Sequence, residues 1–288
     1  MLSYNFFIVL NGITDASRLF IIATGLTITF SLMRIINLAH GVFYLSGGYI
    51  ALTVMEHTGN YLLAILAGSL AICIVGLIIE RGLLIWVRGQ YLPETLLTLA
   101  LTVIFQDLMH LLWGGYPKSI PTPKVLDFSV EIFGLPYPTM RLFTILVAAC
   151  IGIALWLLIE RTKIGAAIRA GVDDRETAAA LGVNIPVIFT IVFSMGAFMS
   201  GFAGVFGGTL TSIAPGQDSQ VLLFGLVVII IGGLGSLAGS AVGALVVGLI
   251  LNFGRAYAPE FTFLLTFSPM LLIIAFRPQG LFGIEMEE

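Results

Sequence analysis

Two stretches of similar pattern, one near each end of the chain, decide the fold. Residues 25–52 read GLTITFSLMRIINLAHGVFYLSGGYIAL, and residues 225–252 read GLVVIIIGGLGSLAGSAVGALVVGLILN. Each is apolar, is interrupted by glycine and polar residues, and then becomes apolar again. Glycine-interrupted segments in corresponding positions of two halves are typical of broken helices at the midplane site of a transporter. A plain glycine-rich helix contact is the alternative, and this pattern alone favours neither.

The composition around these stretches is that of a membrane protein. Of the 288 residues, 58% are hydrophobic and 10% are charged, and the mean hydropathy is +1.06. Soluble domains carry about a quarter charged residues, so this chain cannot cover a water-facing surface. The composition therefore excludes a soluble enzyme, a disordered chain and a nucleic-acid binder. We expect one all-α, polytopic transmembrane domain over residues 1–288.

The apolar runs predict a helical bundle of eight to ten spans. A helix needs about 20 apolar residues to cross a bilayer. The segment 4–13 is too short for this and is predicted to be interfacial or re-entrant. The candidate spans are 16–34, 40–55, 61–79, 92–113, 140–159, 187–207, 221–234, 239–253 and 261–276.

Basic residues in the short loops predict the orientation. Loops 80–91 and 160–185 are rich in arginine, and the C-terminal end begins with Arg277. We therefore expect both loops and the C-terminus to be cytoplasmic. Loop 114–139 is then external, and its five prolines predict a stiff loop with room for a strand pair.

The first break reads INLAHG over Ile36–Gly41. Asn37 can cap a new helix with its side-chain oxygen, and a helix N-terminus suits a carboxylate. Ala39 and Gly41 leave room for a ligand or a neighbouring backbone. His40 either donates to a substrate or satisfies a carbonyl freed by the bend, and both remain open. The predicted pathway residues are Asn37, Ala39, His40, Gly41, Gly47 and Gly48.

The second break reads IGGLGSLAGS over Ile231–Ser240. Its glycines permit sharp turns, and its serines can satisfy freed backbone groups. It lacks the Gly-Lys-Ser/Thr of a phosphate-binding loop, so we expect no ATP on this chain by that motif. The predicted pathway residues here are Gly232, Gly233, Gly235, Ser236 and Gly239.

The loop 160–185 reads ERTKIGAAIRAGVDDRETAAALGVNI and has four basic and four acidic side chains. The stretch Asp173–Leu181 predicts a short helix that Gly182 ends, and Pro186 begins the next span. Such a helix can dock in a partner's groove. The composition by itself favours a solvated connecting loop.

Two ionisable residues fall inside one predicted span. Asp107 and His110 are three apart, near one helical face of residues 92–113. Mutual pairing is favoured, and lining a pathway or relaying protons are the alternatives. No spacing in the chain predicts a metal site or a catalytic triad.

Four motifs taken in order identify a family resemblance over nearly the whole chain. They are GLTITFSLMRIINLAHGVFYLSGGYIA, AAIRAGVDDRETAAALGVN, IGGLGSLAGSAVGALVVGLI and the ending RPQGLFG. With them the chain resembles the LivH-type permease subunit of branched-chain amino acid ABC importers. The resemblance implies an inner-membrane transport subunit, not itself an enzyme, that binds no cofactor. ATP and Mg²⁺ would be held by two partner ATPase subunits.

The resemblance also implies partners and residue roles. A second, LivM-like permease and an extracytoplasmic substrate-binding protein would complete the complex, within membrane lipid and without nucleic acid. The first break would lie at the pathway, opposite Gly232–Gly239. The loop would be the coupling element that fits the ATPase surface, which replaces the solvated-loop interpretation. Its predicted contact residues are Gly165, Arg169, Ala170, Ala178, Ala179, Leu181 and Gly182.

The resemblance leaves the substrate open. Family substrates are usually Leu, Ile and Val, but related members carry urea, short amides or other small carboxylates. Val42 stands where an acidic Glu is often seen, which puts the specific substrate in doubt. The rival hypotheses are a proton-coupled secondary transporter using Asp107 and His110, and an ABC permease for a sugar or nucleoside.

Overall fold

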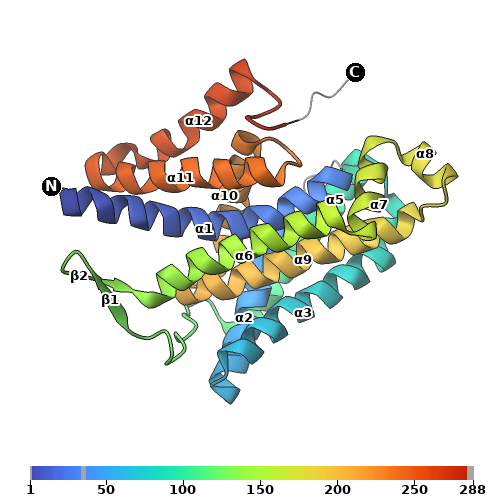
Figure 1. Cartoon of the computed structure of the whole chain (residues 1–288). Coiled ribbons are helices and arrows are strands. Elements are labelled where there is room, and N and C mark those ends of the chain that lie inside the picture. Colours follow the sequence, from blue (N-terminus) through green and yellow to red (C-terminus); the bar gives the residue numbers. More distant parts are fainter. Residues whose placement is uncertain (1, 34–36, 284–288) are drawn as a thin grey trace.

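The apolar runs of the sequence form long helices (Figure 1). The computed structural model describes residues 2–33 and 37–283, so Ile36 of the first break lies outside the described residues. Within the described ranges the long elements are helices and the one sheet has two short strands, which confirms the all-α prediction. The elements are α1 (Leu2–Met33), α2 (His40–Thr58), α3 (Tyr61–Ile79), a π-helical turn (Glu80–Leu84), α4 (Ile85–Val87), α5 (Tyr91–Trp113), β1 (Ser129–Ile132), β2 (Leu135–Pro138), α6 (Thr139–Arg161), α7 (Lys163–Asp173), α8 (Arg175–Ala180), α9 (Ile185–Leu210), α10 (Gln217–Gly232), α11 (Leu237–Tyr257), a 3-10 turn (Pro259–Phe261) and α12 (Thr262–Phe276).

The number of spans fits the prediction. In the described part of the chain, seven helices are long and apolar enough to cross a membrane. The helices α2 and α10 also lie within the bundle, which gives nine long helices against the eight to ten expected. The seven spans are Tyr4–Met33, Tyr61–Val87, Tyr91–Trp113, Thr139–Arg161, Ile185–Leu210, Leu237–Tyr257 and Pro259–Phe276.

The predicted separation of segment 4–13 from the first span is wrong, because α1 runs through it without a break. The polar residues between this segment and the predicted first span, Thr14 and Asp15, have partners on other elements. Thr14 Oγ1 lies 2.9 Å from the Tyr137 hydroxyl, and Asp15 Oδ2 accepts from Asn252 Nδ2 at 2.9 Å. Paired polar side chains are tolerated inside a helix bundle, so the helix continues.

The bundle has two distinct ends, at the left and right of Figure 1. At the hairpin end, β1 and β2 pair antiparallel with Val130 opposite Tyr137, and the Phe133 ring packs edge-on against Phe6 at 5.0 Å. This confirms the predicted strand pair. At the other end, which we call the α7–α8 end, α1 finishes against α7, where Gly171 faces Leu32.

Glycines bring three central helices into close contact. A Cβ added at Gly47 of α2 would lie 2.4 Å from the Cα of Gly201 in α9. A Cβ added at Gly68 of α3 would lie 2.5 Å from the carbonyl oxygen of Gly47. Small residues let helix backbones approach in this way. Gly47 therefore has a packing role, and so has Gly48, which faces the backbone of Gly204.

The short helix predicted at Asp173–Leu181 is present as α8, and the loop holds a further helix, α7, before it. Asp174 ends α7 and caps α8, and its side chain accepts from the backbone N–H groups of Glu176 and Thr177. Gly182 follows with a φ of 89°, a left-handed conformation that suits glycine. Pro186 lies in the first turn of α9, as expected.

Candidate functional site

The helix α2 begins deep inside the bundle. His40, its first residue, is fully buried, and His40 Nε2 lies 3.0 Å from the carbonyl oxygen of Ile22 in α1. Ile22 precedes the last residue of α1 by 11 positions, a distance of about 16 Å along a helix. The first residue of α2 therefore lies well inside the bundle from the α7–α8 end. The His40 ring therefore contacts a carbonyl in the middle of α1 and not one freed by the bend, so neither of the two roles predicted for it is decided.

The start of α10 meets the start of α2. A Cβ at Gly41 would lie 2.2 Å from the carbonyl oxygen of Asp218, so only glycine allows this approach. The Asp218 side chain is buried, and its Oδ2 accepts from Gln106 Nε2 at 2.6 Å. Its other oxygen, Oδ1, has no hydrogen-bond partner among the described residues. A buried carboxylate oxygen beside two helix N-termini is a site that can accept a hydrogen bond from a polar ligand.

The helix α5 supports the turn that leads into α2. Thr102 Oγ1 donates to the carbonyl oxygen of Leu38 at 3.1 Å, and Leu38 N–H donates to Thr98 Oγ1 at 3.4 Å. The Asn37 side-chain oxygen accepts from the Ala39 N–H at 3.0 Å. The N-cap position is Ala39, so Asn37 closes the preceding turn rather than capping α2 itself.

The second break lies at the α7–α8 end, away from the first. Its turn uses Gly233 and Gly235, both with positive φ. A Cβ at Gly235 would lie 3.4 Å from Ser31, close to the end of α1. Ser236 caps α11 by accepting from the N–H of Gly239 at 3.0 Å. No described contact joins residues 37–41 to this break, and the element facing the first break is instead the start of α10.

The C-terminal segment closes the second break. The N–H of Leu281 donates to the carbonyl oxygen of Ile231 at 3.0 Å, and that of Phe282 donates to Gly232 at 2.8 Å. These bonds satisfy carbonyls that the end of α10 leaves free. A Cβ at Gly232 would lie 2.1 Å from the carbonyl oxygen of Gly239, so this region is tightly packed. The motif RPQGLFG thus has a structural role at this break.

Asp107 and His110 both lie on the exposed side of α5. The structure gives no ion pair between these two described residues. The His110 ring instead faces Gly115, where an added Cβ would lie 2.8 Å from it. The mutual pairing favoured from the sequence is therefore not found.

The coupling residues predicted in the loop fall into a buried and an exposed set. Gly165 and Ala178 pack inward, whereas Ala179 and Gly182 are exposed and Leu181 is 80% exposed. Arg169 forms an ion pair with Glu160 at 3.6 Å, and the carbonyl oxygen of Ala170 accepts from Asp174 N–H at 3.0 Å. The exposed residues form a small, partly apolar surface at the tip of the α7–α8 end.

A charged cluster connects this end to the rest of the bundle. Arg175, the first residue of α8, donates to the carbonyl oxygen of Leu32 in α1. Its guanidinium lies 5.0 Å from the centre of the Phe189 ring, and that of Arg88 lies 4.6 Å from the same ring. Arg88 also pairs with the buried carboxylate of Glu80. Cation–π contacts and buried ion pairs hold the parts of such a cluster together.

A family comparison matches almost the whole of this helical arrangement. Residues 8–275 match the family described as the permease component of the branched-chain amino acid transport system. The chain belongs to this permease family. It is therefore a multi-pass membrane subunit for transport rather than an ATPase.

Individual relatives agree with the family. The permease protein BraD of the high-affinity branched-chain amino acid transport system from Pseudomonas aeruginosa is 28% identical, over 95% of this chain and 94% of its own length. The corresponding permease protein LivH of Escherichia coli is 27% identical over the same shares. A chain of PsaBC from Streptococcus pneumoniae, solved in complex with a Fab, matches 94% of this chain and 92% of its own with a TM-score of 0.52. At 13% identity, that likeness shows the fold alone.

Several polar residues of this permease were not singled out from the sequence. Asp218, Thr98 and Thr102 contact the first break or the start of α10, and Glu80 and Arg88 lie in the charged cluster. Glu80, Arg88 and Asp218 lie in the loops beside predicted spans, whereas Thr98 and Thr102 lie inside the span predicted over 92–113. The cost of placing such residues near a bilayer was the available signal, and for Arg88 it was used only to assign orientation.

Proposed function

We propose that this permease carries branched-chain amino acids inward as the membrane subunit of an ABC importer. The observation that carries this proposal is the surface around Leu181 together with the bond from Arg175 to Leu32. An apolar side chain that is 80% exposed on a short polar loop suits a protein partner. The Arg175 bond joins this surface to the end of α1, immediately before the turn that leads into α2.

Two ATPase subunits dock at the α7–α8 end, which is cytoplasmic in this proposal. The clustering of Arg88, Arg169 and Arg175 at that end supports the orientation under the positive-inside rule. Bonds from Leu281 and Phe282 to the second break support a cytoplasmic C-terminus. The hairpin end is then external and receives the substrate-binding protein. A second permease, LivM-like in the proposal, completes the pathway.

ATP supplies the energy through movement of the coupling loop. The ATPase dimer closes on ATP and displaces α8, and Arg175 transmits the displacement to α1 and to Phe189 of α9. Because α1 leads directly into the first break, the start of α2 moves relative to α10. The two arrangements are the inward- and outward-facing states, and ATP shifts the population between them. This chain holds no Gly-Lys-Ser/Thr loop, so hydrolysis occurs on the partners.

The starts of α2 and α10 supply the polar groups that bind the substrate along the transport pathway. The free Oδ1 of Asp218 suits the ammonium group of an amino acid, and the helix N-termini suit its carboxylate. The branched side chain needs only apolar surroundings. The substrate class itself is carried over from the relatives.

The test compares Leu181→Glu with the matched variant Leu181→Met in the complex of both permeases, the ATPases and the binding protein. In proteoliposomes, L181E should lose ligand-stimulated ATP hydrolysis and uptake, because a charge replaces an apolar contact. L181M should retain both. Ala179→Glu, on the same surface, should behave as L181E does. Unchanged ligand-stimulated hydrolysis in both glutamate variants would rule out this surface as the ATPase contact.

A further inference from the structure

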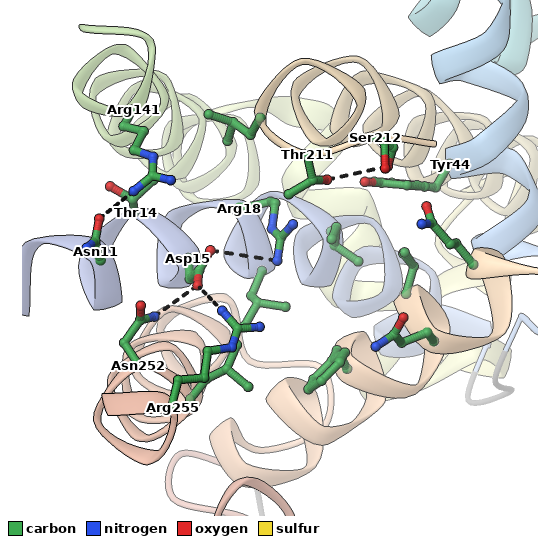
Figure 2. A pocket seen from close by; sticks show the side chains of 18 residues that line it. Asn11, Thr14, Asp15, Arg18, Tyr44, Arg141, Thr211, Ser212, Asn252 and Arg255 are labelled. Carbon is green, nitrogen blue, oxygen red and sulfur yellow. Dashed lines mark hydrogen bonds and ion pairs between the residues drawn. The ribbon is translucent and has the colours of Figure 1, made fainter. Parts of the chain in front are cut away.

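A polar cavity of about 450 Å³ opens in the half of the bundle toward the hairpin end. It lies between α1, α6, α10 and α11, and Figure 2 shows the side chains that line it. The cavity extends to Ile22, whose carbonyl oxygen contacts His40, so it reaches the depth at which α2 begins. The proposed transport mechanism assigns no role to this cavity.

The charges in the cavity are unbalanced. Three arginines, Arg18, Arg141 and Arg255, line it together with one carboxylate, that of Asp15. Figure 2 shows Asp15 joined to Arg18, Arg255 and Asn252. Positive charge at membrane depth is costly unless it is paired, so this excess favours an added anion.

Arg18 is the arginine with unused hydrogen-bonding capacity. Its side chain is 19% exposed, and its contact with Asp15 is long at 3.7 Å. Its Nε is buried and has no hydrogen-bond partner among the described residues. Arg255 forms an ion pair with Asp15 at 3.3 Å, and the Arg141 guanidinium donates to Asn11 Oδ1 at 2.6 Å. A guanidinium whose donors are only partly used is suited to bind a carboxylate or phosphate group.

We propose that this cavity binds a small oxyanion, a carboxylate or a phosphate group, with Arg18 as its main ligand. Arg255 contributes charge at the cavity wall, and Asp15 Oδ2 is occupied by hydrogen bonds from Asn252 and Arg255. The shared chemistry has two sources: a free anion in solution, such as an amino-acid carboxylate, or the headgroup of an anionic phospholipid. The proposal does not depend on the transport function, because binding to the purified chain tests it.

The first measurement is the thermal unfolding temperature of the purified full chain in dodecyl maltoside. Sodium acetate, leucine and sodium phosphate are compared with sodium chloride at equal ionic strength. A ligand that binds only the native state raises the unfolding temperature. Native mass spectrometry after purification with phosphatidylglycerol provides the second readout, which is the retention of that lipid.

The variants are Arg18→Gln, Arg255→Gln and the control Arg277→Gln, which lies outside the cavity. We expect R18Q to weaken anion binding about tenfold, the effect of losing one charged hydrogen bond. R277Q should bind as the wild type does. If R18Q does not fold, R255Q decides, because the Arg255 side chain is 57% exposed and its replacement should leave the fold intact. It should bind more weakly than the wild type, and unchanged binding in R255Q would overturn the proposal.

Two outcomes would support the site, and each identifies a different source of the bound oxyanion. Arg18-dependent stabilisation by acetate, leucine or phosphate identifies a soluble anion. Arg18-dependent retention of phosphatidylglycerol, without stabilisation by free anions, identifies a lipid headgroup. The proposal is overturned if none of the anions raises the unfolding temperature more than chloride does and no lipid is retained. It is also overturned if R18Q binds the anion or the lipid as the wild type does. Failure here would leave the proposed transport function intact, because that function is tested by uptake.

Discussion

Arg175 in α8 donates a hydrogen bond to the carbonyl oxygen of Leu32, next to the last residue of α1. This bond joins the exposed loop of the α7–α8 end to the helix that precedes the first break. The same guanidinium lies over Phe189 of α9, so one side chain of α8 contacts two other elements. If the loop is the coupling element proposed above, an arginine held this way can pass a movement into the bundle.

Replacement of this arginine should separate ATP hydrolysis from transport. We expect Arg175→Ala to retain ATP hydrolysis by the complex and to lose about tenfold in uptake per ATP, within the usual range of coupling free energies. The measurement is simultaneous hydrolysis and leucine uptake in proteoliposomes. Arg161→Ala, which removes an arginine that contacts Trp156 instead, is the control. An unchanged ratio in R175A would show that the bond to Leu32 transmits nothing.

The contact between α2 and α10 should not tolerate a side chain at Gly41. In Gly41→Ala the new Cβ would lie 2.2 Å from the Asp218 carbonyl oxygen, so the two helix starts must separate. We expect a loss of about 1–3 kcal/mol in stability, the usual cost of overpacking. Thermal unfolding of the purified chain measures it. Gly82→Ala is the control, since nothing lies within 4 Å of a Cβ there, and an equal effect in both variants would contradict the proposed packing.

Asp218 should affect substrate affinity more than Asp107. We expect Asp218→Asn to raise the KM for leucine uptake about tenfold, because a carboxylate oxygen is replaced where we place the substrate ammonium group. Asp107→Asn should leave uptake unchanged, because Asp107 is on the exposed side of α5. The reverse pattern, loss in D107N and normal uptake in D218N, would favour the proton-coupled rival.

The cap of α8 should respond to acid. Hydrogen bonds from Thr177, through its hydroxyl and its backbone N–H, hold the pKa of Asp174 below its ordinary value. A lowered pKa in the folded state means that the cap stabilises α8 above the unfolded pKa, and that this stability is lost as the pH falls through the folded pKa. Amide hydrogen exchange of Glu176 and Thr177, corrected for its intrinsic pH dependence, should lose protection on acidification. Asp174→Asn, which can still cap but does not titrate, should remove this pH dependence; its persistence would contradict the cap assignment.

The sequence predicted the helical class and the number of long helices, because long apolar runs leave few other structures in a membrane. It also predicted that the loop helix ends at Gly182 and that α9 starts at Pro186, because glycine and proline signals are local in the sequence. It failed where segment 4–13 joins the first span, because Thr14 and Asp15 at that junction pair with Tyr137, Asn252 and Arg255, which are distant in sequence.

The candidate site depends on contacts that no local pattern contains. The sequence identified the first break, but the partner of Gly41 is Asp218 and not the second glycine-rich stretch. The second break instead bonds to Leu281 and Phe282. The similarity of the two motifs led to the prediction that the two breaks face each other. Tertiary packing decides which elements meet, and no local pattern contains it. The charged cluster could not be predicted for the same reason, because Arg88 and Arg175 are distant in sequence and both lie over the Phe189 ring.

The most direct test of the central claim is leucine uptake by proteoliposomes that contain this chain with its partner permease, ATPase subunits and binding protein. We expect that uptake requires ATP and the binding protein, and that an imposed proton gradient cannot replace them. Uptake by this chain alone, driven by a proton gradient without ATP, would contradict it.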